Sequence, residues 1–270
     1  MSWTFGAAIL SARHKMAAMP TGLARERQGG GARRLWPDAA TLPVGDARER
    51  LGGTARDRAL GARMAELYFA FGVAYAIVMV TGFVSLGNLS KPLADPYLGI
   101  AEGLIIAMAP VMVMLMGAVY ACAPAGAKMK ALVAIGWMVA AAATTVTVHV
   151  VLLTVGRQLN ASTFPGYAHV FSFTWPSVFY AVDIVAWDVF VGLSLLFAAP
   201  AFQGARDTWA RRGLLVAGVL CLVGLVGPAV DNLAWRGLGI FGYAIVLPLT
   251  CLAIRRSFSR PETTEPLAES

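Results

Sequence analysis

The sequence predicts an all-α membrane protein: a bundle of six transmembrane helices with both termini in the cytoplasm and a disordered, basic N-terminal tail. Three observations predict this class. The 270 residues are 58% hydrophobic and only 14% charged, whereas charged residues make up about a quarter of a soluble domain. Long apolar runs alternate with short polar breaks, and basic residues gather in every second break.

Each apolar run is long enough to cross a bilayer, which takes about 20 helical residues. The runs are too apolar all round for soluble amphipathic helices. Backbone groups in lipid must also pair internally, so we expect each run to be a helix. Within a transmembrane domain of residues 64–256, the expected spans are 67–86, 98–121, 131–155, 176–199, 213–230 and 237–254.

Prolines and glycines indicate how these helices begin, end and pack. Pro176 suits the first turn of the fourth helix, and Pro228 should bend or end the fifth. Close packing of the fifth and sixth helices is expected from their glycines. These are Gly218, Gly224, Gly227, Gly239 and Gly242.

The tail, residues 1–63, has 11 basic and 5 acidic residues and no sustained apolar period. This composition predicts disorder, apart from one short helix around residues 2–19. Residues 257–270 form a second, C-terminal tail. Met64 directly precedes the first apolar run, so a biological start at Met64 is an alternative. We expect a chain beginning there to insert into the membrane.

The breaks between spans predict the orientation. One set of breaks and the C-terminus hold eight basic residues, and the opposite breaks hold three, namely Lys91, Arg157 and Arg236. The richer set is Lys128, Lys130, Arg206, Arg211, Arg212, Arg255, Arg256 and Arg260. The positive-inside rule then places both termini in the cytoplasm, and we expect a bacterial inner membrane.

Two aspartates stand well inside the fourth apolar run, at Asp183 and Asp188. A carboxylate at the centre of a membrane helix costs about 2.5–3.5 kcal/mol on insertion scales. Each must therefore face protein or water and have a partner. In an α-helix the two lie about 140° apart, so protein should cover two sides of this helix and make it central in the bundle.

Helix rise places several polar residues near one level. His149, Asp183 and Tyr243 should lie about 10 Å below the outer boundary, and Glu102 slightly nearer to it. Asp188 is deeper, at the level of Thr144. The sequence thus predicts a polar cavity in the outer half of the bilayer. Its expected lining is Glu102, His149, Asp183, Asp188, Tyr180, Trp187 and Tyr243, with Asp231 and Asn232 at the outer rim.

Each of these residues also has a purely structural interpretation. The aspartates can be clasps between helices, and His149 a hydrogen-bonded interior histidine. Glu102 and Asp231 can be solvated helix ends, and the aromatic residues can be packing groups. The long break 156–175 is either an interfacial connector or a lid over the cavity.

Several chemistries are excluded or unsupported. The three cysteines, Cys122, Cys221 and Cys251, fall in apolar segments without CxxC spacing and are read as packing residues. Three histidines are too few for a multi-haem cytochrome b, and no HExxH, GxSxG or phosphate-loop motif is present. We therefore predict no metal and no cofactor. The excess of basic residues lies in the tail, which argues against a nucleic-acid partner.

Three functions remain open, all with the lipid bilayer as partner. The first is a transport-like protein that handles protons or a small molecule through the cavity. The second is an intramembrane enzyme acting on a lipid or isoprenoid, with an aspartate as general acid and His149 as base. The third is a non-catalytic assembly or sensory subunit whose acids are structural.

Overall fold

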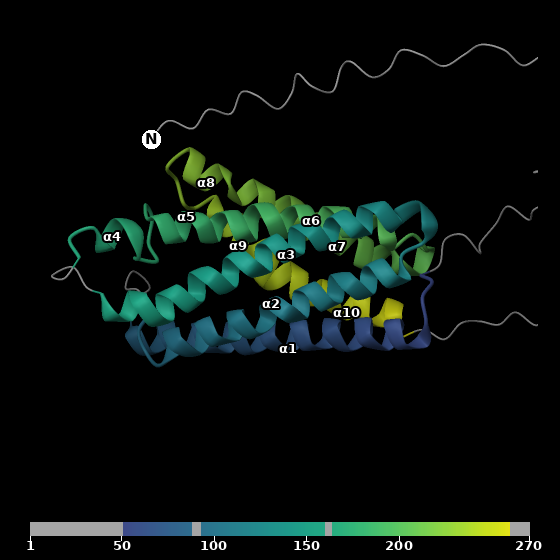
Figure 1. Ribbon diagram of the computed structural model, residues 1–270, viewed down its shortest axis with the longest axis horizontal. Coiled ribbons are helices and arrows are strands. Elements are labelled where there is room, and N and C mark those ends of the chain that lie inside the picture. The colour runs from purple at the N-terminus through teal and green to yellow at the C-terminus, as the bar shows by residue number, and fades with distance from the viewer. Residues whose placement is uncertain (1–50, 88–92, 160–163, 260–270) are drawn as a thin grey trace, which may run out of the picture. The chain divides into compact units, whose positions relative to one another are not determined.

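The computed structural model describes residues 51–87, 93–159 and 164–259. The chain divides into two units, Met1–Val44 and Gly45–Ser270, and all the described residues belong to the second. Throughout these ranges every regular element is a helix (Figure 1). Six helices are long and apolar enough to cross a membrane. The expected all-helical membrane class and the count of six spans are therefore confirmed, and the protein is an integral membrane protein.

Several spans consist of more than one helical segment. The first two are α1 (Ala55–Leu86) and α2 (Tyr97–Cys122), and the third is α3 (Lys128–Val151) continued by the π-helical η2 (Leu152–Gly156). The fourth joins α5 (Val178–Ile184), the π-helical η3 (Val185–Val191) and α6 (Gly192–Ala198). The fifth is α7 (Thr208–Gly224) followed by α8 (Val226–Ala229). The sixth joins α9 (Arg236–Phe241), the π-helical η6 (Gly242–Val246) and α10 (Leu247–Phe258).

Short helices occupy the connections. One α-helical turn, α4 (Tyr167–Val170), lies between the third and fourth spans. Three 3₁₀ turns lie at the other end of the spans: η1 (Ala125–Ala127), η4 (Ala199–Ala201) and η5 (Ala205–Asp207). We call that end, where α1 begins and α10 ends, the terminal end. The end that carries α4 and α8 is the opposite end.

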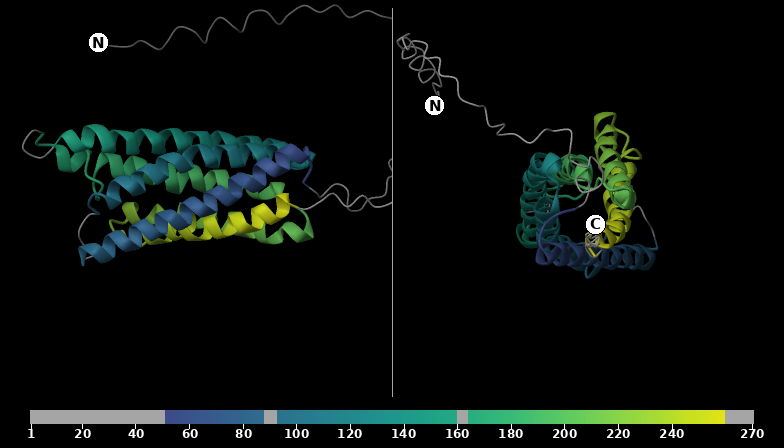
Figure 2. Two further views of the ribbon diagram at one scale, coloured as in Figure 1. Left: turned by 90° about the horizontal axis from the view of Figure 1, so that it is seen from below. Right: turned by 90° about the vertical axis from the view of Figure 1, so that its right-hand side faces the viewer.

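The six spans pack in chain order into a closed ring (Figure 2). α1 contacts α2, α2 contacts α3, and α3 contacts η3 and α6. The fourth span in turn contacts α7, α7 contacts the sixth span, and α10 returns to α1. Every span therefore has two neighbours and turns its remaining surface towards the ring interior or towards lipid.

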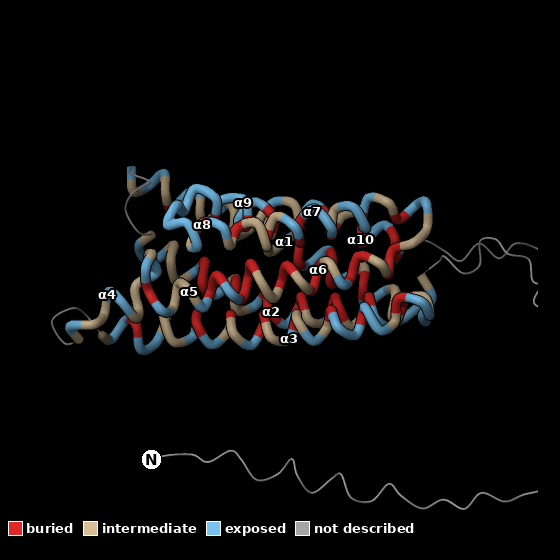
Figure 3. The backbone as a smooth tube through the Cα atoms, turned by 90° about the horizontal axis from the view of Figure 1, so that it is seen from above, coloured by how far each residue is buried: buried red, intermediate tan, exposed pale blue. Residues whose placement is uncertain are grey.

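Buried residues line the inside of the ring, whereas the outward faces are exposed (Figure 3). The interior of the terminal half is almost entirely apolar. Its large side chains include Met112 and Met116 of α2, Met138 of α3, Leu195 of α6 and Leu247 of α10. The fourth span has the largest buried share of the six, but it is one member of the ring and not the central helix that its two aspartates led us to expect.

α1 begins twelve residues before the expected first span, at Ala55 rather than residue 67. Thr54 caps it, accepting a hydrogen bond from the Asp57 N–H at 3.2 Å, while Asp57 accepts one from the Thr54 N–H at 2.9 Å. Gly61 is buried, and a Cβ there would lie 2.7 Å from the Phe258 ring. Residues 55–63 thus belong to a packed helix, whereas the short helix expected at residues 2–19 falls outside the described residues.

Of the two proline expectations, the one for Pro176 needs correction and the one for Pro228 is confirmed. Pro176 precedes Ser177, the N-cap of α5, so it lies just outside the helix instead of in its first turn. In the fifth span α7 ends at Gly224, before Pro228, and the chain resumes as α8. Pro228 has no N–H to bond the carbonyl of Gly224 four residues earlier, so the break after Gly224 is the bend expected of this proline, and the span ends one residue after it, at Ala229.

The glycine expectation holds in part. A Cβ on Gly224 would lie 2.9 Å from the Gly239 Cα, and one on Gly242 would lie 3.0 Å from the Ala217 carbonyl. These glycines therefore let the fifth and sixth spans approach closely. Gly218 instead faces the fourth span, because a Cβ on Gly218 would lie 2.8 Å from the carbonyl oxygen of Gly192.

We expect a chain that starts at Met64 to insert into the membrane but to be less stable than one that starts at Leu51. The shorter chain lacks the Thr54–Asp57 capping box and the Gly61–Phe258 contact. Loss of a helix N-cap alone costs about 1 kcal/mol. Thermal unfolding of both purified chains in one detergent measures the difference. Equal melting temperatures would show that the first turns of α1 contribute nothing.

Candidate functional site

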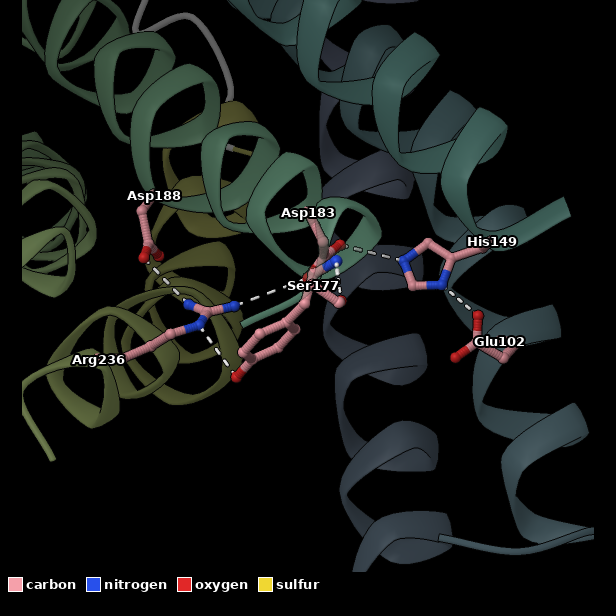
Figure 4. A network of polar contacts seen from close by, with 7 residues as sticks. Glu102, His149, Ser177, Asp183, Asp188 and Arg236 are labelled. Atoms are coloured by element: carbon pink, nitrogen blue, oxygen red, sulfur yellow. Dashed lines mark hydrogen bonds and ion pairs between the residues drawn. The ribbon is translucent and has the colours of Figure 1, made fainter. Parts of the chain in front are cut away.

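Polar side chains from four spans meet in the half of the bundle nearer the opposite end (Figure 4). His149 of α3 lies between two carboxylates, and its exposed fraction is 1%. Its Nδ1 contacts Oε2 of Glu102 from α2, and its Nε2 lies 3.3 Å from Oδ1 of Asp183 from α5. The imidazole therefore connects the second span to the fourth, and His149 and Asp183 lie as close together as their depths predicted.

Arg236, the first residue of α9, extends this chain of contacts. Its Nη2 lies 3.6 Å from Oδ2 of Asp183, and its Nη1 donates to Oδ2 of Asp188 at 3.0 Å. Its Nε donates to the Tyr180 hydroxyl at 3.3 Å, and the guanidinium stacks over the Tyr180 ring. One arginine thus binds both aspartates of the fourth span.

Acidic and basic groups alternate along this network, which we define as Glu102, His149, Asp183, Arg236 and Asp188. All five side chains are buried. Alternation places an opposite charge beside every ionisable group, which offsets much of the cost of taking charges out of water. Three atoms of the network nevertheless have no hydrogen-bond partner within the described part of the chain, namely His149 Nε2, Asp183 Oδ1 and Asp188 Oδ1.

The backbone of the fourth span explains how one arginine reaches both aspartates. Asp183 ends the regular α5, and Asp188 lies in the π-helical η3. Hydrogen bonds from residue i to i+5 widen the turn, so residues five apart come closer to one face than in an α-helix. The expected 140° separation is therefore wrong, because it assumed α-helical geometry throughout.

Within the described ranges all three π-helical segments adjoin this network. η2 follows His149 by three residues, η3 contains Asp188, and η6 begins six residues after Arg236. A π-segment weakens the local hydrogen-bond ladder and is found frequently at functional sites. Their placement shows that the helices depart from regular geometry where the ionisable groups meet.

The connection between the third and fourth spans covers the network. Ser177 caps α5 by accepting the Tyr180 N–H at 3.2 Å, and its hydroxyl donates to the Ser172 carbonyl. This anchors the segment that carries Phe173. The Phe173 ring centroid lies 5.8 Å from that of His149 and 5.1 Å from that of Tyr180. Phe173 therefore packs directly over the imidazole.

The remaining predicted residues surround the network without joining it. Trp187 and Tyr243 pack on each other with ring centroids 4.9 Å apart. Asp231 and Asn232 are exposed at the opposite end. Asp231 accepts a hydrogen bond from the Trp175 indole at 3.3 Å, and Asn232 accepts one from the Ala234 N–H at 3.1 Å.

Sequence reasoning missed Arg236, which it counted as a loop charge. In the structure Arg236 is only 2% exposed and lies in the first turn of α9. A signal was available, because two acids within an apolar span require a cation. Of the three basic residues at that end, only Arg236 directly precedes an apolar run. The pairing of Asp188 with Arg236 was missed for the same reason.

Two glycines shape the space around Asp188. A Cβ on Gly239 would lie 2.6 Å from Oδ1 of Asp188, and one on Gly224 would lie 2.9 Å from Oδ2. The carboxylate therefore occupies room that exists only because both neighbouring positions lack a side chain. This position has no space for a larger group without movement of the fifth or sixth span.

Comparison of this chain with protein-family models, with curated proteins and with solved structures finds no match. The argument for function therefore depends on the geometry of the site.

We expect Arg236→Gln to destabilise the protein by about 3–5 kcal/mol, because it leaves buried carboxylates without their cation. The double variant Arg236→Gln/Asp188→Asn should recover part of this loss, since it removes one of the unpaired charges. Unfolding of the purified variants measures both effects. The matched control is Arg157→Gln, which breaks the exposed pair with Asp95 at 2.6 Å and should cost about 0–1 kcal/mol.

Proposed function

We propose that this protein handles protons in the membrane, binding and releasing them at the buried network to drive or gate transport. The proposal rests on one observation: the buried chain of contacts contains unequal numbers of acidic and basic groups. Three carboxylates face two bases, and these groups reach one another through side chains from four spans.

The charge of the network supports a proton-binding role. With every group ionised, three acids and two bases give a net charge of −1. Binding one proton makes the network neutral. A buried net charge is costly in apolar surroundings, so proton binding is favoured, and the neighbouring charges decide which group holds the proton. Asp188 Oδ1, which has no hydrogen-bond partner among the described residues, is one atom that can hold that proton.

The arrangement around His149 is suited to proton transfer. An imidazole can accept a proton at one ring nitrogen and release one from the other. Glu102 contacts Nδ1, and Asp183 lies 3.3 Å from Nε2. A proton that enters at Glu102 can therefore move towards Asp183, where the path ends, because the Arg236 guanidinium stays protonated and cannot pass a proton on.

The network lies nearer to one end of the bundle than to the other. Glu102 lies five residues from the start of α2 at the opposite end. Towards the terminal end, Met112 follows Glu102 by ten residues, or about 15 Å. A hollow beside Met112 measures only about 10 Å³ and has an apolar lining, at the lower limit for one water. A position near the opposite end and closure towards the terminal end fit one state of a transporter.

The orientation that we infer indicates which side of the membrane lies nearer to the network. Since Arg236 is buried in the network, Lys91 and Arg157 are the basic residues left in the opposite breaks, against eight on the other side. The positive-inside rule then favours cytoplasmic termini. In a bacterial inner membrane the network would exchange protons with the periplasmic side.

A second candidate function is supported by the pairing itself. Every carboxylate of the network has a basic partner within 4 Å, so the network can be a clasp that holds four spans in register. In that case the protein is an assembly or sensory subunit, and its network has one constant protonation state.

We expect the network to bind and release a proton as the pH changes, because its net charge with every group ionised favours binding one proton. Infrared difference spectra of the wild-type protein in bilayers should show a carboxylic-acid band that responds to pH. Glu102→Gln and Asp183→Asn should remove or shift that band. In liposomes with a pH-sensitive dye inside, both variants should lower protein-dependent proton flux by about tenfold or more.

The control for both measurements is Glu66→Gln, which removes an exposed acid paired with Arg255 on the surface of α1 and α10. It should leave the band and the flux unchanged. If wild-type protein shows no pH-dependent band and no flux, while Asp183→Asn only lowers the melting temperature, the clasp is correct and proton handling is wrong.

Phe173→Ala should speed proton exchange at His149 without changing the charge of the network. Phe173 covers the imidazole, and its removal opens a path for water from the opposite end. Time-resolved infrared spectra after a pH jump measure the exchange rate. Phe164→Ala is the matched control, because it removes a ring that packs edge-on against Phe171 in the same connection. Equal rates in wild type and Phe173→Ala would exclude a lid.

A further inference from the structure

A hollow of about 320 Å³ lies at the terminal end of the bundle, away from the buried network. It forms where the fourth span turns into the fifth. Its lining comes from the connection after α6 and from the first turns of α7: Phe202, Gln203, Gly204, Thr208, Arg211, Arg212 and Leu215. Its volume falls in the range of small-molecule and cofactor sites, about 300–1,000 Å³.

The charge in this hollow is not neutralised by the described residues. Arg211 and Arg212 are both exposed, and no acid in ranges 51–87, 93–159 and 164–259 forms an ion pair with either. Asp207, the acid of the adjoining turn, is buried and does not line the hollow. Two guanidinium groups therefore present their donors to the same open space.

The other polar side chains of the lining already have acceptors. Gln203 donates to the Pro200 carbonyl at 2.9 Å, and Thr208 donates to the Ala205 carbonyl at 2.7 Å. The arginines are thus the charged donors that remain for a ligand. Guanidinium groups match the oxygens of a phosphate and bind them in pairs, so the chemistry of this hollow favours a phosphate group.

The surroundings indicate what the phosphate is attached to. Leu215 lies in the lining and is exposed, and Val216 and Val219 continue the exposed apolar face of α7 away from the terminal end. Trp209, which follows Thr208 of the lining in the chain, is 75% exposed, and tryptophan is enriched at membrane interfaces. The hollow therefore opens where a lipid-facing surface meets the polar end of the bundle.

We propose that this hollow binds the phosphate headgroup of an anionic phospholipid, with Arg211 and Arg212 on the phosphate and the acyl chains along Leu215, Val216 and Val219. Basic pockets at the ends of membrane helices bind such headgroups. This site is separate from the buried network and does not depend on the proposed proton chemistry.

Lipid binding to the full-length protein in neutral detergent tests the proposal. Native mass spectrometry and thermal unfolding are measured with phosphatidylglycerol, with phosphatidylcholine and with inorganic phosphate. Phosphatidylglycerol should bind and raise the melting temperature more than the other two probes. Arg211→Gln/Arg212→Gln should weaken its binding by about thirtyfold, the effect of two basic side chains at an anionic surface.

The matched control is Arg63→Gln/Arg256→Gln, which removes the same charge from exposed positions of α1 and α10 outside the hollow. This control should bind phosphatidylglycerol as the wild type does. Equal losses in both double variants, or no loss in either, would overturn the site. An equal effect of inorganic phosphate would identify a soluble anion as the ligand and overturn the lipid assignment.

Discussion

The structure depends on the need to compensate charges that are buried among apolar side chains. Asp183 and Asp188 project from the most buried span, and Arg236 binds both. An isolated buried ion costs several kcal/mol even after the protein relaxes. This requirement holds the start of the sixth span against the middle of the fourth. It also brings His149 and Glu102 into the same chain of contacts, since Asp183 can satisfy two bases at once.

The backbone adapts to this requirement. Regular α-helices would place Asp183 and Asp188 on different sides of the fourth span, but the π-helical turn between them brings both within reach of one guanidinium. Gly224 and Gly239 then leave the space that the Asp188 carboxylate fills. Local departures from ideal geometry persist only when contacts with the surrounding structure hold them in place. Here the ion pairs of Arg236 with Asp183 and Asp188 hold the π-helical turn.

The two halves of the bundle interior have different chemistry. The half nearer the opposite end holds the ionisable network under Phe173, and the terminal half is filled by methionine, leucine and other apolar side chains. A polar site that ends in a dry, packed layer is not a continuous pore. A function that moves protons or solutes across this layer requires the layer to open, and unbranched methionine side chains repack more readily than branched ones.

The sequence by itself determined the membrane class and the six spans, and it singled out Glu102, His149, Asp183 and Asp188 as ionisable residues within those spans. Apolar run length and the cost of buried charge are local properties, and helix rise converts residue number into depth. Tertiary structure decided the rest. Arg236 stands at the border between a break and a span, so only packing shows that it turns inward. The π-turn before Asp188 and the early start of α1 likewise depend on contacts with other spans, which one-dimensional periodicity does not contain.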